Sequence, residues 1–209
     1  MNKEIDNNFV ELVGEISKEA EYSYEIYGEK FYIISMKVQR TSGNEDEIPV
    51  MVSGRMCNPK EFYTGQRLKV SGQFRSYNRH EETANRLILY VFVQEMEFLD
   101  EMQDDLQVND IYLDGYICKE PTYRKTPLGR EISDLLVAVN RSYGKSDYIP
   151  CICWGRNARY VSGLEVGSRV KICGRIQSRE YQKRISDTET ETRVAYEVSA
   201  GKINVVEEN

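Results

Sequence analysis

The chain has 209 residues, of which 40% are hydrophobic and 30% charged, with a formal net charge of −6. This composition is typical of a globular protein, and no stretch approaches the ~18 apolar residues of a membrane helix, so no membrane partner is expected. Residues 1–6 contain no apolar run, so we expect no signal peptide and a cytoplasmic protein.

A repeat divides the chain into two halves. The segment IPVMVSGR at 48–55 returns as IPCICWGR at 149–156, and the landmarks around it return at an offset of 101 or 102 residues. Chance does not hold such a register over many landmarks, so the sequence predicts two copies of one fold. We expect one domain over residues 1–102 and a second over residues 103–209.

Each half is predicted to form five short strands, because alternating apolar runs are separated by turn residues. The first-half strands are expected at 9–16, 31–38, 48–53, 66–75 and 87–99. The second-half strands are expected at 110–118, 132–140, 148–154, 168–179 and 194–206, with a short helix at 157–161. Strands one and two are expected to be joined by long loops. Five strands, with at most a short helix between the third and fourth, predict an all-β chain of two tandem five-stranded OB-fold barrels.

The third strand of the second half carries an aromatic face. Ile149, Cys151 and Cys153 share one parity and suit a barrel interior, whereas Tyr148 and Trp154 point the other way. Outward rings are costly to leave in water unless a ligand or a partner covers them. Single-stranded nucleic acid can do so, because each base that stacks on a ring contributes ~1–3 kcal/mol.

The first half lacks these rings, since Glu47 and Ser53 stand at the two matching positions. Charge follows the same division. Residues 1–105 contain 12 Lys and Arg against 20 Asp and Glu, whereas residues 106–209 contain 16 against 14. We therefore expect the first barrel to be mainly structural, with an acidic and degenerate stacking face, and the second barrel to contact nucleic acid.

Cations accompany the rings on the fourth strand of the second half and in the hairpin that follows it. Cations interleaved with aromatic rings form a groove that holds phosphates and stacks bases. The contacts predicted here are Arg169, Lys171, Arg175, Arg179, Tyr181, Lys183 and Arg184.

Neither a catalytic site nor a metal or cofactor site is expected. The five cysteines are an odd number in a chain without an evident leader, and Cys151 and Cys153 are interpreted as buried reduced thiols, because a zinc site needs four clustered ligands. The single histidine cannot complete a catalytic triad, and no phosphate-binding Gly-Lys-Ser/Thr loop is present, so the chain is not expected to be an enzyme.

Five motifs follow one another through the second half. They are N-x-I-x-L-x-G-x-I at 109–117, P-x-Y-R-x-T-P-x-G at 121–129, AVNR at 138–141, DYIPCICWG at 147–155 and GRIQSREY at 174–181. In these motifs the second half resembles the bacterial single-stranded DNA-binding protein family, and the first half resembles it more faintly through the repeat. The resemblance implies an OB-fold that binds single-stranded DNA without sequence preference in replication, recombination or repair.

The resemblance also implies site residues and partners. It places the family's stacking rings on Tyr143, Tyr148, Trp154 and Tyr181, and its motif arginines on Arg124, Arg141, Arg175 and Arg179. Family members usually assemble four barrels, so two barrels per chain imply a homodimer. The family's long flexible extension with an acidic tip is not evident, so we do not expect recruitment of replication enzymes by that route.

An adaptor function is the alternative from another class. A tandem OB-fold protein could bury its aromatic face against a partner protein or a second copy, because interfaces are rich in aromatic residues and a fold does not determine its function. The acidic first half favours this alternative, since it could contact a basic protein.

Overall fold

The computed structural model describes residues 7–80, 85–100, 107–186 and 189–207. The first half contains β1 (Asn8–Ile26), β2 (Glu29–Gln39), β3 (Glu45–Ser53), β4 (Arg67–His80) and β5 (Asn85–Phe98). The second contains β6 (Val108–Ile117), β7 (Thr122–Lys125), β8 (Glu131–Asn140), β9 (Ser146–Trp154), β10 (Arg169–Arg184) and β11 (Thr190–Val206). Short helical turns are η1 (Pro59–Glu61), η3 (Ser142–Gly144) and α1 (Arg156–Val161). No helix among the described residues is long and apolar enough to span a membrane.

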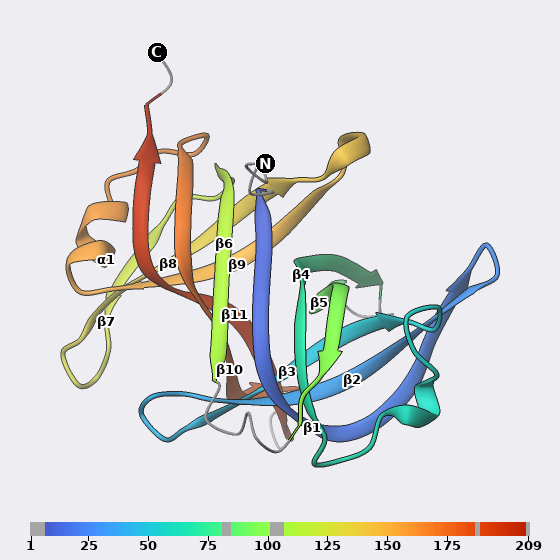
Figure 1. Cartoon of the computed structure of the whole chain (residues 1–209). Helices are drawn as coiled ribbons and strands as arrows, with labels where there is room; N and C mark the ends of the chain where they lie inside the picture. The colour runs from blue at the N-terminus through green and yellow to red at the C-terminus, as the bar shows by residue number, and fades with distance from the viewer. Residues whose placement is uncertain (1–6, 81–84, 101–106, 187–188, 208–209) are drawn as a thin grey trace.

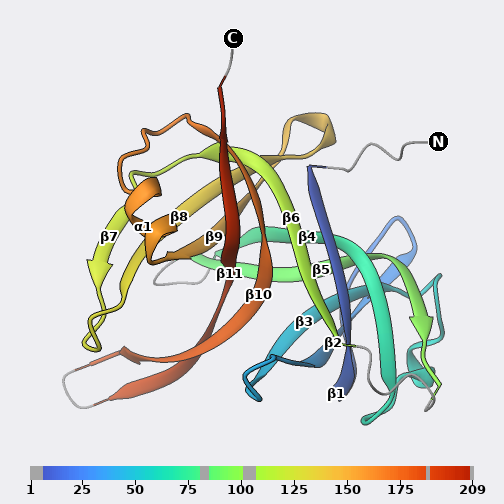
Figure 2. The same cartoon turned by 60° about the vertical axis from the view of Figure 1, so that its left-hand side comes forward.

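Each half closes into a five-stranded barrel. The strand order is β2-β3-β5-β4-β1 in the first half, where β1 also pairs with β2, and β6-β10-β11-β9-β8 in the second, where β6 also pairs with β8. The third and fifth strands of each barrel run parallel, whereas the other pairs are antiparallel. Figures 1 and 2 show the two barrels side by side. The prediction of two tandem OB-fold barrels is confirmed, and the expected boundary between residues 102 and 103 lies outside the described residues.

The barrel interiors are filled by the apolar parity of each strand. On β9, Ile149, Cys151 and Cys153 are buried, and on β3 the matching Ile48 and Val50 are fully buried. Small apolar side chains at these positions fit the narrow barrel, and each buried residue contributes roughly 1.5–3 kcal/mol of transfer free energy. The inward parity predicted from the sequence is confirmed in both halves, but Met51 and Ile152, which share the outward parity, are buried as well.

The connection between strands one and two of the first half is a hairpin, so the predicted long loop is wrong there. Strand β1 runs on to Ile26, and β2 begins at Glu29. Tyr27 and Gly28 both have positive φ, at 49° and 76°, as a two-residue hairpin turn of type I′ requires. In the second half the corresponding segment contains β7, which pairs with β8.

The two barrels are joined edge to edge through their first strands. Strand β1 pairs antiparallel with β6, and Val10 lies opposite Ile111, its own counterpart in the repeat. A pairing centred on equivalent residues is what a two-fold axis between identical subunits would produce. The chain is thus built like a symmetric dimer of OB-folds carried on one polypeptide, with a continuous sheet across the junction.

A buried carboxylate on one side of the junction holds the two barrels together. Asp147 is 1% exposed and accepts hydrogen bonds from the Arg141 guanidinium and from the backbone N–H of Ser76 in the first barrel. The backbone N–H of Tyr148 donates to Ser76 Oγ at 2.7 Å, and Arg141 Nη2 donates to the Ser76 carbonyl at 3.1 Å. The carboxylate therefore satisfies groups from both halves.

The repeat places the same arrangement on the other side of the junction. Asp46 is fully buried and accepts from the Arg40 guanidinium and from the backbone N–H of Ser178, the latter at 2.7 Å. The backbone N–H of Glu47 donates to Ser178 Oγ at 3.1 Å, and Arg175 adds an ion pair to Asp46 at 3.3 Å. The junction therefore contains two Asp clamps, centred on Asp46 and Asp147.

A repeated glycine lets strand four bend in each barrel. Gly72 and its counterpart Gly174 lie beside an irregularity in the ladder between strands four and five. A Cβ at Gly72 would approach the Phe92 carbonyl oxygen to 2.0 Å, and one at Gly174 would approach the Ser199 carbonyl oxygen to 2.2 Å. The close backbone approach explains why glycine stands at both positions.

Removing one Asp clamp is expected to destabilise the protein. Asp46→Ala leaves two guanidinium groups and a backbone N–H without their acceptor, so we expect unfolding to cost about 3–5 kcal/mol less free energy, measured by urea denaturation. Arg55→Ala removes an exposed ion pair to Glu29 and serves as the control, with an expected loss of at most ~1 kcal/mol. Equal losses in the two variants would contradict the role of the clamp.

Candidate nucleic-acid interface

Strand β9 presents two aromatic rings on the outside of the second barrel. Tyr148 is 43% exposed and Trp154 is 38% exposed, so neither ring is sealed within the chain. They lie six residues apart on one face of the strand, which corresponds to roughly 20 Å at ~3.3 Å per residue. Pro150 lies between them on the same face, and Ile152 is buried. Both ends of the face are open to a planar ligand.

Tyr181 lies in a groove between the two barrels. The groove has a volume of about 460 Å³ and is lined mainly by apolar side chains of β5 and β11, with Pro49 and Pro150 at equivalent positions. Lys183 lines it as well, and the Tyr181 ring is 38% exposed. Since Pro150 belongs to the outer face of β9, the groove adjoins the face that carries Tyr148.

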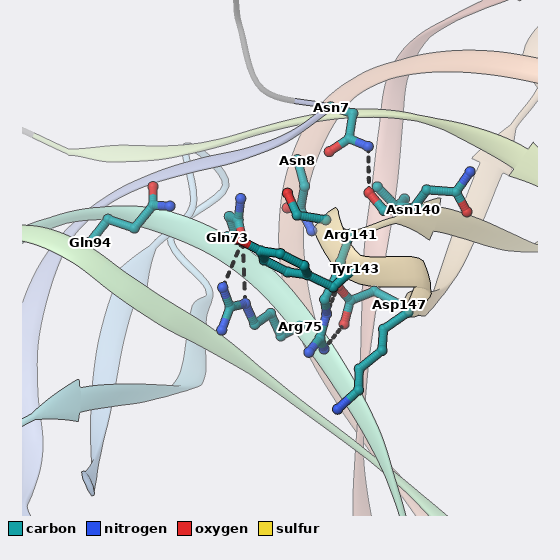
Figure 3. Close-up of a pocket in the computed structure, with 12 residues that line it drawn as sticks. Asn7, Asn8, Gln73, Arg75, Gln94, Asn140, Arg141, Tyr143 and Asp147 are labelled. Atoms are coloured by element: carbon teal, nitrogen blue, oxygen red, sulfur yellow. Dashed lines mark hydrogen bonds and ion pairs between the residues drawn. The ribbon is translucent and has the colours of Figure 1, made fainter. Parts of the chain in front are cut away.

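Tyr143 projects from the turn between β8 and β9. Its backbone has a φ of 70°, in the left-handed region that non-glycine residues seldom occupy, and its ring is fully exposed. A residue held in such a conformation with its side chain in solvent marks a candidate binding position. Tyr143 borders a large pocket between the barrels, shown in Figure 3.

Several predicted cations on exposed strands are paired with carboxylates. Arg169 forms two contacts with Asp114, at 2.9 and 3.0 Å, and Lys171 Nζ lies 3.9 Å from the same carboxylate. Arg124 pairs with Asp134 at 2.9 Å. Such surface ion pairs contribute only about 0–1 kcal/mol, so these cations remain able to exchange a carboxylate for a phosphate.

The last strands hold the remaining cations. Arg179 Nε lies 3.8 Å from Glu197 Oε1, and Arg184 Nε donates to the Ser186 carbonyl oxygen at 3.1 Å. The tip of their hairpin at 187–188 lies outside the described residues.

Arg141 and Arg175 lie in the Asp clamps instead of on the open face. The hydrogen bond to Asp147 raises the pKa of Arg141, whereas burial and the neighbouring Arg40 lower the pKa of Arg175. Both guanidinium groups are only partly exposed, and each contacts the opposite barrel. A phosphate that binds either arginine would therefore also affect the contacts between the two barrels.

The first barrel carries an aromatic cluster that comparison of the third strands did not reveal. The Tyr24 and Phe31 rings stack at 4.9 Å across the β1–β2 hairpin, Phe31 lies 5.9 Å from Phe92, and Tyr77 contacts Tyr90 at 5.9 Å. The rings come from β1, β2, β4 and β5. The absence of rings at the matching positions of β3 therefore could not predict them. The tyrosine-rich segment before residue 28 was the available signal.

The cysteines of β9 belong to the core. Cys151 and Cys153 are buried, and no group of three or more histidine, cysteine or acidic residues among the described residues could hold a metal ion. Burial raises the pKa of Cys153 to about 12 and raises that of Cys151 as well. Both thiols therefore stay protonated near neutral pH.

The fold and these rings define a tandem OB-fold protein with an exposed aromatic and cationic face on its second barrel. Residues 108–205 match the model of the "Single-strand binding protein family". The second half of the chain is therefore similar to this family.

Relatives resemble part of the sequence, and a solved structure resembles the whole fold. Single-stranded DNA-binding protein A of Bacillus subtilis (strain 168) is 34% identical over 82 residues, which cover 36% of this chain and 48% of the relative. Single-stranded DNA-binding protein 2 of Listeria innocua is 33% identical over 93 residues, covering 39% and 58%. The chain thus spans about half the length of these relatives. The single-stranded DNA binding protein of Thermus aquaticus has a similar fold, with a TM-score of 0.73 at 19% identity, covering 97% of this chain and 94% of that one.

Thiol reactivity in the native protein tests the placement of the cysteines. Because the thiolate is the reactive form, iodoacetamide at pH 8 is expected to modify the exposed Cys173 and to leave Cys151 and Cys153 unmodified until the protein is unfolded. Mass spectrometry of the digested protein gives the modified positions. Rapid modification of Cys151 or Cys153 in the folded protein would contradict their burial.

Proposed function

We propose that the chain binds single-stranded DNA without sequence preference, mainly through the outer face of its second barrel, and protects it during replication, recombination or repair. The observation that carries the proposal is the pair of exposed rings on β9, Tyr148 and Trp154, beside the groove that contains Tyr181. The match of residues 108–205 to the single-strand binding protein family and the names of the relatives support the same ligand.

The physical basis is stacking combined with phosphate contacts. Each base that stacks on a ring gains ~1–3 kcal/mol whatever its identity, because every base has a π-face. Phosphates would follow the exposed cations, of which Arg124, Arg179 and Lys183 lie outside the Asp clamps. Arg169 and Lys171 lie beside Asp114 and offer a more peripheral contact.

Assembly into a homodimer with four barrels is part of the proposal. The outer face of the continuous sheet leaves Phe9 39% exposed, and Tyr112 stands opposite it on β6. A paired aromatic patch at the centre of the sheet suits contact with the same patch of a second chain. Mass measurement in solution tests this part, and the expected value is twice the 24.3 kDa of one chain.

The adaptor alternative differs in its response to salt and to DNA. A strand binder that neutralises Z phosphates loses affinity with a slope of about −0.7Z against the logarithm of salt concentration. An adaptor whose rings are covered by a protein would show neither DNA affinity nor this slope.

The single tryptophan reports directly on the proposed site. Trp154 is the one tryptophan of the sequence, so oligo-dT is expected to quench the emission of the protein, and the affinity is expected to fall as salt rises. Saturating oligo-dT that leaves the emission of the folded protein unchanged would refute the stacking role of Trp154.

Ring removal provides a second test. Trp154→Ala and Tyr148→Ala should each weaken oligo-dT binding roughly 5- to 100-fold, the equivalent of ~1–3 kcal/mol of stacking, without unfolding the barrel. Tyr63→Ala is the matched control, because Tyr63 is an exposed ring of the first barrel that is not among the proposed contacts. Affinities measured by fluorescence anisotropy that are equal in all three variants and the parent would contradict the stacking role of Tyr148 and Trp154.

A further inference from the structure

A second candidate site lies between the two barrels, at the end of the junction near Tyr143. It is a pocket of about 1060 Å³, which we call the junction pocket. Figure 3 shows that its residues come from both halves of the chain. It is lined by Asn7, Asn8, Gln73, Arg75, Gln94, Val139, Asn140, Arg141, Ser142, Tyr143, Lys145 and Asp147.

Arg75 is the unusual residue of this pocket. Its guanidinium lies 3.8 Å from the centre of the Phe92 ring and donates to the neutral Gln73 Oε1 at 3.0 and 3.3 Å. No ion pair joins Arg75 to a carboxylate in the described parts of the chain. Burial and the nearby Arg141 both lower its pKa. Asp147 lines the same pocket and attracts Arg75, but its carboxylate is hydrogen-bonded to Arg141, so an anion in the pocket would give the half-buried Arg75 guanidinium a direct partner.

The rest of the lining suits a nucleotide. Lys145 is exposed at the rim, and no carboxylate among the described residues pairs with it. Side-chain amides of Asn7, Gln94 and other residues offer both donors and acceptors to a base or a sugar. The exposed Tyr143 ring supplies a stacking surface.

The repeat supplies an internal comparison. The equivalent pocket on the other side of the junction is lined by Arg40, Ser42, Asp110 and Arg175, among others, and has a volume of about 390 Å³. There Arg40 and Arg175 both pair with Asp46, and Ser42 stands where the junction pocket has Tyr143. Among the described residues, an arginine with no carboxylate at ion-pair distance and an exposed aromatic ring therefore occur together on one side of the quasi-symmetric junction.

We propose that the junction pocket holds a phosphate of the bound single strand on Arg75 and Lys145, next to the base that the family resemblance already places on Tyr143. The pocket would then carry the strand from the second barrel to the aromatic cluster of the first, since Arg75 also contacts Phe92 of that cluster. This inference rests on the proposed function, and it assigns to the first barrel a direct contact with the strand.

The test compares Arg75→Gln with Arg55→Gln in salt-dependent binding of a long oligo-dT. Arg75→Gln is expected to weaken binding about tenfold at low salt and to reduce the salt slope by about 0.7, the loss of one phosphate contact. Arg55→Gln, which removes an exposed cation paired with Glu29, should leave both unchanged. Arg75→Lys should restore the slope, which separates charge from packing, and thermal melting monitors folding of each variant.

A second readout locates the base. Tyr143→Ser copies Ser42 of the equivalent pocket and should weaken binding several-fold. An oligonucleotide containing 5-iodouracil should form a photo-adduct on Tyr143 in the parent protein, identified by mass spectrometry. Quenching of Trp154 is expected to persist in both Arg75→Gln and Tyr143→Ser, because the second-barrel face is intact.

The outcomes separate the two proposals. If oligo-dT fails to bind or to quench Trp154 in the parent protein, the proposed function itself is wrong. If the parent quenches normally while Arg75→Gln and Tyr143→Ser bind with the affinity and salt slope of the parent, and no adduct forms on Tyr143, the junction pocket is not a strand site.

Discussion

The antiparallel pairing of β1 with β6, reinforced by the two Asp clamps, is the constraint on which the rest of the structure depends. It fixes the barrels about an axis at Val10 and Ile111, so that each buried aspartate binds backbone and guanidinium groups from both halves. Two carboxylates almost without exposure are tolerated only because they are fully hydrogen-bonded. The chain therefore has the interface of a symmetric dimer within one polypeptide, and its two halves are held as one body.

The two barrels share one backbone arrangement but differ in their surface residues, so one face of the molecule is better suited to bind a strand than its counterpart. The clamps and glycines are repeated, whereas the residues at the surface differ: Tyr148 and Trp154 replace Glu47 and Ser53, and Tyr143 replaces Ser42. These surface differences leave the junction intact and place exposed rings on the second barrel. A strand lying on β9 and entering the junction pocket would touch both barrels, so the first barrel would contribute binding as well as support.

Much of the fold follows from the sequence, because the repeat and the alternation on strands such as β9 are local patterns. The barrel order, the buried Cys151 and Cys153, and the exposed Tyr148 and Trp154 agree with expectation. The placement of the arginines does not follow from the sequence: Arg175 belongs to the outward pattern and Arg141 is a motif arginine of the resemblance, yet both contact the opposite barrel. The alternation of inward and outward side chains describes a single barrel, and it does not predict which residues contact the other barrel. For the same reason, the cluster around Phe92 and the position of Arg75 in the junction pocket emerge only from the tertiary arrangement.

The most direct test is a structure of the protein with a bound oligo-dT. The account predicts bases stacked on Trp154 and Tyr148, and a phosphate within hydrogen-bonding distance of Arg75 in the junction pocket. Rings on β9 covered by another protein chain, with the oligonucleotide absent or bound on a different surface, would contradict it.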